Sequence, residues 1–187
     1  MRLILLAPAF LLLFAGCAPA ASNLTNPLTA SRYGDELADT MANLIINEDP
    51  TTKNEAMRKL IEKEIGRGKN IATEAREIQA KGWAGGFVSI RADVRGYVLY
   101  LPDTVYISPD FETEPGPALR VYLTTVVDPR DAEFPDATAV DVGPLQSAYG
   151  AQEYRVPPQK EEGKLRTFVL YDTRLNMIYG FAQIVKL

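Results

Sequence analysis

The spacing of apolar residues changes at Trp83, and this change divides the chain into two regions. Before Trp83, apolar residues recur three or four positions apart, which is typical of amphipathic helices. After it, short stretches alternate apolar with polar residues between many prolines and glycines, which is typical of antiparallel strands. The sequence therefore predicts a mainly β protein with an α-helical N-terminal extension, in which the C-terminal region forms an antiparallel β-sandwich or a barrel-like domain.

Residues 29–82 form the expected helical segment, which we divide into three helices. Asp49-Pro50 separates the first helix from the second, and Gly66 or Gly68 is expected to end the second. Each helix has one narrow apolar stripe, so each needs a partner surface to be stable. The segment either docks on the C-terminal domain or extends from a membrane as a stalk. Burial of three stripe residues against that domain would indicate docking: Met41, Leu60 and Ile78.

Residues 83–187 are expected to form the β domain, because six short strands are predicted in it. The predicted strands cover residues 87–90, 97–101, 105–107, 119–127, 165–171 and 177–185. The fourth strand alternates most clearly. Its residues Leu119, Val121 and Leu123 are expected on one face, and Arg120, Tyr122 and Thr124 on the other.

The beginning of the chain follows the pattern of a secretory leader. Arg2 supplies a positive charge, and residues 3–14 are almost entirely apolar. This run is shorter than the roughly 20 residues that a membrane-spanning helix needs. Two small residues then precede Cys17, which resembles the lipobox of bacterial lipoproteins. The pattern predicts a signal peptide over residues 1–16 and a covalent diacylglycerol on Cys17.

Cys17 is the only cysteine of the chain, so it has no partner for an internal disulfide. Residues 17–28 are small, polar and flanked by proline, and we expect them to form a flexible tether between the lipid and the domain. Several acyl chains on one cysteine would hold the protein firmly on a membrane. Ala18 follows the cysteine in place of an aspartate, which favours the outer membrane and the periplasm if the cell is Gram-negative.

The composition limits which metal-binding and catalytic sites the chain can form. The chain has no histidine, and its one cysteine is expected to carry lipid. Histidine-bound metal sites and Ser-His-Asp or Cys-His catalysis are therefore excluded. Without Arg2 the chain has 19 basic and 24 acidic residues and no basic stripe with interleaved aromatics, so we expect no nucleic-acid partner. We also expect no metal, since the acidic loop from Asp128 to Asp141 lacks the spacing of a calcium-binding loop and charge runs are usually solvated.

Four stretches of the C-terminal region carry a resemblance to a known family. They are residues 85–101, 110–123, 142–154 and 168–182, and the second fits the pattern F-x-x-x-x-G-P-x-L-x-V-Y-L from Phe111 onward. In this order they resemble the DM13 domain, a module associated with electron-transfer proteins in animals and found alone in bacterial lipoproteins. The resemblance implies a β-rich domain with a suggested role in electron transfer.

The resemblance also directs attention to Asp172. The thiol chemistry suggested for the family depends on a cysteine after the aromatic residue of the fourth stretch, and Asp172 stands at that position. A carboxylate cannot form a disulfide or a sulfenic acid. Asp172 is therefore either a ligand or acid–base group, or a turn aspartate bonded to its own backbone. The frequency of aspartate in turns favours the second interpretation.

Our leading hypothesis is a membrane-anchored, non-enzymatic module that binds an envelope protein or a small ligand. The candidate surface includes Asp110, Gly116, Pro117, Tyr122 and Asn176. The alternative is a redox auxiliary in electron transfer. It would need a bound organic cofactor, since no side chain here supplies electrons, and the many tyrosines would line its cleft. A hydrolase that uses carboxylates alone is a third hypothesis, which requires two acids with shifted ionisation in one cleft.

Overall fold

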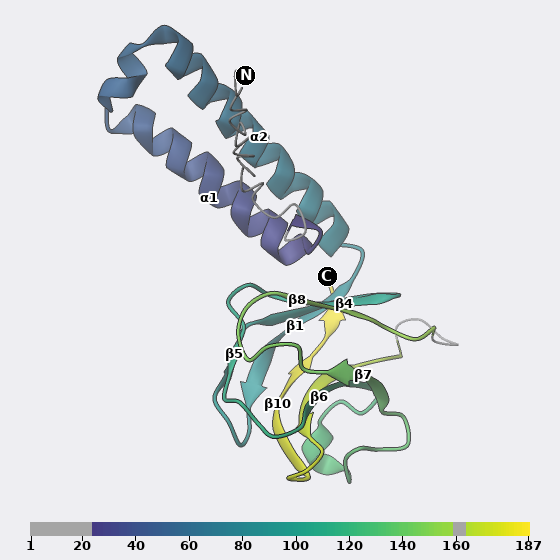
Figure 1. Cartoon of the computed structure of the whole chain (residues 1–187). Coiled ribbons are helices and arrows are strands. Elements are labelled where there is room, and N and C mark those ends of the chain that lie inside the picture. Colours follow the sequence, from purple (N-terminus) through teal and green to yellow (C-terminus); the bar gives the residue numbers. More distant parts are fainter. Residues whose placement is uncertain (1–23, 159–163) are drawn as a thin grey trace, which may run out of the picture.

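The computed structural model describes residues 24–158 and 164–187. The predicted signal peptide, Cys17 and the first part of the predicted tether lie outside the described residues. Two regions follow each other along the chain, a helical hairpin and a β domain (Figure 1). The prediction of a mainly β protein with an α-helical N-terminal extension is confirmed.

The hairpin consists of helix α1 (Pro27–Ile46), the 3₁₀ turn η2 (Pro50–Lys53) and helix α2 (Glu55–Gln79). Asn26 caps α1, because its Oδ1 accepts a hydrogen bond from the Leu28 amide at 2.9 Å, and Pro27 occupies the first helical position. The helix thus includes the last two residues of the predicted tether, Pro27 and Leu28.

The prediction of three helices is wrong, because α2 continues through Gly66 and Gly68. Gly68 is buried where the two helices cross. A Cβ atom there would lie 2.6 Å from the carbonyl oxygen of Gly34, and a Cβ on Gly34 would lie 2.5 Å from the carbonyl oxygen of Gly68. Glycine at these two positions therefore allows the two backbones to touch. The close packing of the helices outweighs the tendency of glycine to end a helix.

The β domain contains eleven strands among the described residues. They are β1 (Trp83–Ser89), β2 (Val94–Arg95), β3 (Tyr97–Leu101), β4 (Thr104–Ile107), β5 (Glu112–Thr113), β6 (Leu119–Thr124), β7 (Val140–Pro144), β8 (Gln152–Arg155), β9 (Thr167–Asp172), β10 (Met177–Gln183) and β11 (Val185–Lys186).

All strand pairs are antiparallel, and the main sheet has the order β7-β6-β9-β10-β1-β3-β4-β8, with β11 beside β1. The edge strands β7 and β8 come close to each other, so the sheet is a nearly closed barrel (Figure 1). This confirms the barrel-like form of the expected fold. The prediction did not include β7 and β8.

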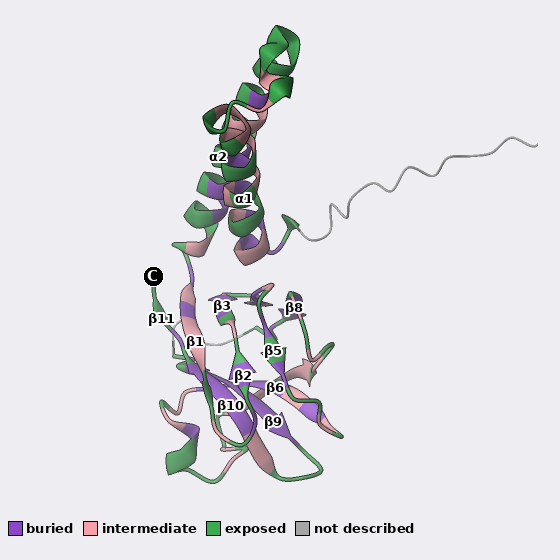
Figure 2. Cartoon of the chain, turned by 90° about the vertical axis from the view of Figure 1, so that its left-hand side faces the viewer, coloured by how far each residue is buried: buried purple, intermediate pink, exposed green. Residues whose placement is uncertain are grey.

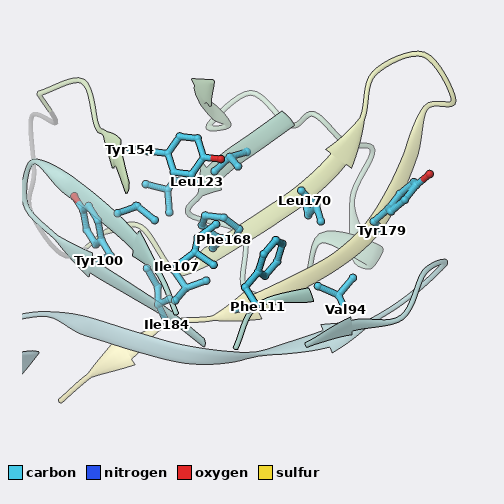
Figure 3. Close-up of a cluster of buried hydrophobic side chains, with 14 of the residues drawn as sticks. Val94, Tyr100, Ile107, Phe111, Leu123, Tyr154, Phe168, Leu170, Tyr179 and Ile184 are labelled. Carbon is cyan, nitrogen blue, oxygen red and sulfur yellow. The ribbon is translucent and has the colours of Figure 1, made fainter. Parts of the chain in front are cut away.

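The main core fills the interior of this barrel (Figure 3). Phe168 and Leu170 of β9 and Val121 and Leu123 of β6 are fully buried there. The expected inner face of the 119–127 stretch is thus confirmed, although the strand ends at Thr124. Tyr122 points to the opposite face, where it belongs to a second apolar cluster with Val169, Tyr171 and Phe181.

The two ends of the hairpin meet the β domain at a narrow waist (Figures 1 and 2). Asn26 Nδ2 donates a hydrogen bond to the carbonyl of Ile107 at 2.9 Å, and the Leu187 amide donates to the carbonyl of Gly82 at 3.2 Å. Leu60 and Ile78 remain 51% and 42% exposed. The hairpin therefore does not dock along the domain. The N-terminal end of α1 nevertheless contacts the domain through the hydrogen bond of Asn26 to Ile107.

Among the described residues, neither α1 nor α2 has a stretch that is long and apolar enough to cross a membrane.

Candidate functional site

Asp172 is the last residue of β9. It precedes the turn into β10, which lies at the end of the barrel opposite the hairpin (Figure 1). This residue shares the inner face of its strand with Phe168 and Leu170, two positions apart each time. Its side chain is fully buried. Asp172 therefore closes the interior of the barrel at this end.

Three backbone amides donate hydrogen bonds to the Asp172 carboxylate. Oδ1 accepts from Arg174 and Leu175 of the following turn, at 2.9 and 3.0 Å. Oδ2 accepts from Ala118 at 3.0 Å, on the loop before β6. The carboxylate thus holds its own turn, as the favoured interpretation expects, and also ties that turn to a loop 54 residues away.

The ionisation of Asp172 reflects two opposing effects. Burial alone would raise the pKa of this carboxyl. The three backbone hydrogen bonds and the nearby charge of Arg174 outweigh burial and lower the pKa below its ordinary value. The same negative charge adds to the effect of burial on the neighbouring Tyr179, whose pKa is raised. Asp172 is therefore a charged structural group at neutral pH.

The Pro115-Gly116-Pro117 loop covers Asp172. A Cβ atom on Gly116 would lie 2.6 Å from Asp172 Oδ2 and 2.7 Å from the Tyr179 hydroxyl oxygen, so only glycine fits without displacement. On its outer side this loop borders an open groove of about 380 Å³. We call it the Gly116 groove; it is lined by residues 115–119 and 144–148.

A second hollow of about 250 Å³ lies beside the β9–β10 turn, and we call it the Arg91 hollow. Its lining includes Arg91, Arg130, Phe134, Tyr171 and Asn176. The rings of Phe134 and Tyr171 are 5.2 Å apart at their centroids. The guanidinium of Arg130 is paired with Asp128 and lies 5.5 Å from the centroid of the Phe181 ring. Arg91 and the aromatic rings of this lining suit a planar anion, whereas the charge of Arg130 is compensated by Asp128.

The structure brings together only some of the residues of the predicted surface. Gly116 and Pro117 border the groove above Asp172, and Asn176 lies in the adjacent turn with φ of 50°. Tyr122 is buried in the outer cluster, where its ring packs against Phe134 and Tyr171 of the Arg91 hollow. Asp110 is exposed near the waist, where its charge helps to raise the pKa of Arg32 after the larger effect of Glu36.

The acidic residues after β6 are engaged with neighbouring groups. Asp128 pairs with Arg130, and hydrogen bonds from that side chain lower the pKa of Asp128 to about 2. Asp141 forms two hydrogen bonds with Arg120, at 2.9 and 3.0 Å. Asp136 accepts hydrogen bonds from Thr124 and Thr138. Over residues 24–158 and 164–187, no cluster of three potential metal ligands is present.

Sequence reasoning missed two parts of this site. The Ala118 amide gives no sequence signal, because any residue except proline can donate there. Arg91 lies in the β1–β2 loop, and Arg130 and Phe134 lie in the β6–β7 loop; neither loop has a periodic pattern. Only pairing of β1 with β10 and of β6 with β9 brings these loops to one end of the barrel.

The fold and the site define a small antiparallel barrel module. At one end of the barrel, the buried Asp172 carboxylate holds the adjoining turn and loop through hydrogen bonds. The family model described as electron transfer DM13 matches residues 86–184, just over half of the chain. The chain therefore belongs to the DM13 family, whose description indicates a module related to electron transfer. No curated protein and no solved structure matched the chain.

Proposed function

We propose that this chain is a lipid-anchored envelope protein whose DM13 domain is a non-enzymatic binding module for a partner protein or a small ligand. The observation that supports the binding role is the set of hydrogen bonds that the Asp172 carboxylate accepts. Its two oxygens accept three backbone hydrogen bonds, so the residue at the family's cysteine position stabilises the fold. The surfaces beside it are then the features available for recognition.

The Gly116 groove supports this role. It joins apolar side chains such as Leu119 and Leu145 to polar ones such as Gln146 and Ser147. Binding sites combine an apolar lining with a few polar groups that orient the ligand. The hydrogen bond from Ala118 to Asp172 and the two prolines around Gly116 restrict movement of the loop. A rigid site loses less entropy on binding.

The anchor is proposed from the sequence alone. The leader over residues 1–16 and the lone Cys17 favour export and lipidation, and Ala18 favours the outer membrane and periplasm in a Gram-negative cell. A test is labelling of growing cells with an alkyne fatty acid. We expect label in the full chain and none in a Cys17→Ser variant, with the labelled protein in the membrane fraction. Equal labelling of both variants would overturn the anchor.

The binding role can be tested by photo-crosslinking in the same cells. A photoreactive residue at Pro117 reports on the Gly116 groove, and one at Arg155 of β8 reports on an exposed position outside its lining. We expect a discrete crosslinked species from position 117 that is absent from position 155 and is lost when Gly116→Val displaces the loop. Identical products from both positions would contradict a specific site.

The Arg91 hollow favours a second candidate function, a redox auxiliary with a bound organic cofactor. Arg91 would hold an anionic group, and Phe134 and Tyr171 would contact a planar ring. The cofactor would supply the electron chemistry. The absorbance spectrum of the native protein separates the two candidates, because a bound flavin or quinone absorbs at longer wavelengths than the polypeptide.

A further inference from the structure

The two long sides of the hairpin differ in chemistry. One side carries ion pairs, including Asp35 with Arg76 and Arg58 with Glu62. The other side exposes apolar side chains, and its residues 33, 57, 60 and 78 are 39–51% exposed. We call this side the apolar face; it is defined by Tyr33, Leu44, Met57, Leu60, Ile71 and Ile78.

Helical spacing places these residues on one face. Leu60 and Ile71 in α2 are eleven positions apart, as are Tyr33 and Leu44 in α1, and eleven residues complete about three helical turns. The stripes of the two helices lie on the same side of the hairpin, because Arg67 Nη2 reaches the Tyr33 hydroxyl at 3.5 Å.

Helical spacing also places the polar residues of both helices on one side of the hairpin. Asp35 follows Tyr33 by two positions and Arg76 precedes Ile78 by two, which is about 200° around each helix. Asp35 and Arg76 form an ion pair with each other across the two helices. The hairpin is therefore amphipathic, with one polar side and one side on which exposed apolar side chains surround the Arg67–Glu64 ion pair.

The chain enters the hairpin on its apolar side. Leu24 lines a hollow of about 240 Å³ together with Ile71, Ile78 and the base of α1. Six residues separate Leu24 from Cys17. Even fully extended, this connection spans at most about 25 Å. A lipid on Cys17 would thus hold the membrane close to the apolar face.

We propose that the apolar face of the hairpin lies on the lipid surface to which Cys17 is attached. This inference rests on the proposed lipid anchor. Amphipathic helices lie in the membrane interface with their apolar side toward the acyl chains and their charged side toward water. The short connection brings Leu24 and its neighbouring apolar residues to that interface. Arg67 lies within this face, seven positions after Leu60 and four before Ile71, and it forms an ion pair with Glu64. Its guanidinium can reach the headgroups while its stem covers apolar surface.

The experiment uses the chain from Cys17 to Leu187, coupled through its only thiol to a maleimide lipid in vesicles of phosphatidylethanolamine and phosphatidylglycerol. Chemical coupling supplies the anchor, so the result is independent of lipidation in cells. Trp83→Phe removes the one native tryptophan. Leu60→Trp then places a probe on the apolar face, and Glu62→Trp places a matched probe on the polar side of the same turn.

Brominated acyl chains quench tryptophan that enters the interface. We expect about two-fold quenching at position 60 and almost none at position 62, because interfacial helices insert about 5–10 Å on one side. A Leu60→Trp, Met57→Lys chain should lose most of this quenching while retaining its circular dichroism spectrum.

Equal quenching at positions 60 and 62, or none at either, would overturn the proposal. A blue shift of the Leu60→Trp emission with rising protein concentration, without vesicles, would also overturn it and would assign the face to a second copy of the chain. Failure of the anchor in cells is reported separately by fatty-acid labelling of Cys17.

Discussion

The hairpin and the β domain are held together by different kinds of residues. The buried residues at the crossing of α1 and α2 are mostly Gly and Ala, as Gly34, Ala38, Gly68 and Ala72 show. The interior of the barrel is filled by large side chains such as Phe168. The hairpin therefore depends on close approach of two backbones, whereas the barrel depends on burial of large apolar surfaces.

The sequence separation of the contacts also differs between the two regions. The hairpin joins two helices that are neighbours in the chain, with one short turn between them. In the barrel, β1 pairs with β10 and β11, so the first strand needs the last residues of the domain. We therefore expect the barrel to fold as one unit and the hairpin to open locally at lower free energy. Trp83 in β1 reports on the barrel, and far-ultraviolet circular dichroism reports on the helices.

The largest expected effect is that of Phe168→Ala in the barrel core. Phe168 is fully buried, and removal of such a ring costs about 3–5 kcal/mol of the free energy of unfolding. Urea titration followed by Trp83 fluorescence measures this loss. A cost below about 1 kcal/mol, in the range of surface substitutions, would contradict the claim that burial of large side chains stabilises the barrel.

Asp172→Ala should cost about 3 kcal/mol, because three buried amides lose a charged acceptor. The folded-state pKa of Asp172 is lowered, so its stabilising contribution is present above the unfolded-state pKa near 3.9 and is lost as pH falls through the folded-state pKa. The difference in stability between the wild type and Asp172→Asn should thus be greatest at neutral pH and shrink below about pH 4. Urea titrations across this pH range test both points; a constant difference would contradict the lowered pKa.

Gly34→Ala sharpens the comparison on the side of the hairpin. The added Cβ would meet the Gly68 carbonyl oxygen at 2.5 Å, so the helices must separate, at a cost of about 2 kcal/mol to the hairpin. Gly66→Ala is the matched control, because a Cβ there meets nothing within 4 Å and should stabilise α2 by about 0.5–1 kcal/mol. Thermal unfolding by circular dichroism should separate the two variants while the Trp83 transition stays unchanged.

The smallest effect is expected for Asn26→Ala at the waist. This substitution removes the cap of α1 and the hydrogen bond to the Ile107 carbonyl, at a cost of about 1–2 kcal/mol. Hydrogen exchange should accelerate in the first turn of α1. If exchange also accelerated throughout the barrel, the two regions would unfold together and the comparison would fail.

The sequence predicts the barrel better than the hairpin for a physical reason. Alternation along residues 119–124 reports on which side chains face the interior of the barrel, and the inner face was confirmed, although Tyr122 and Thr124 on the other face are buried as well. The strand β7 has no such signal, because it contains Gly143 and Pro144 and is determined by its pairing with β6. The continuation of α2 through Gly68 depends on contact with Gly34, which local propensity does not contain.

The candidate site shows the same division. The turn role of Asp172 was the favoured interpretation, and its bonds to Arg174 and Leu175 confirm it. Its third bond, to Ala118, depends on pairing of β6 with β9 and has no sequence pattern. The surface residues gather only in part, because Asp110 precedes the loop that leads to Gly116 and lies near the waist.

The most direct test of the proposed function is the intact mass of the protein purified from its native envelope, measured under native and then denaturing conditions. The proposal predicts a covalent lipid on Cys17 that persists after unfolding, with no redox-active cofactor that is released by unfolding. An unmodified Cys17 would contradict the anchor. An organic cofactor released on unfolding, together with visible absorbance, would contradict the non-enzymatic binding role and establish the redox alternative.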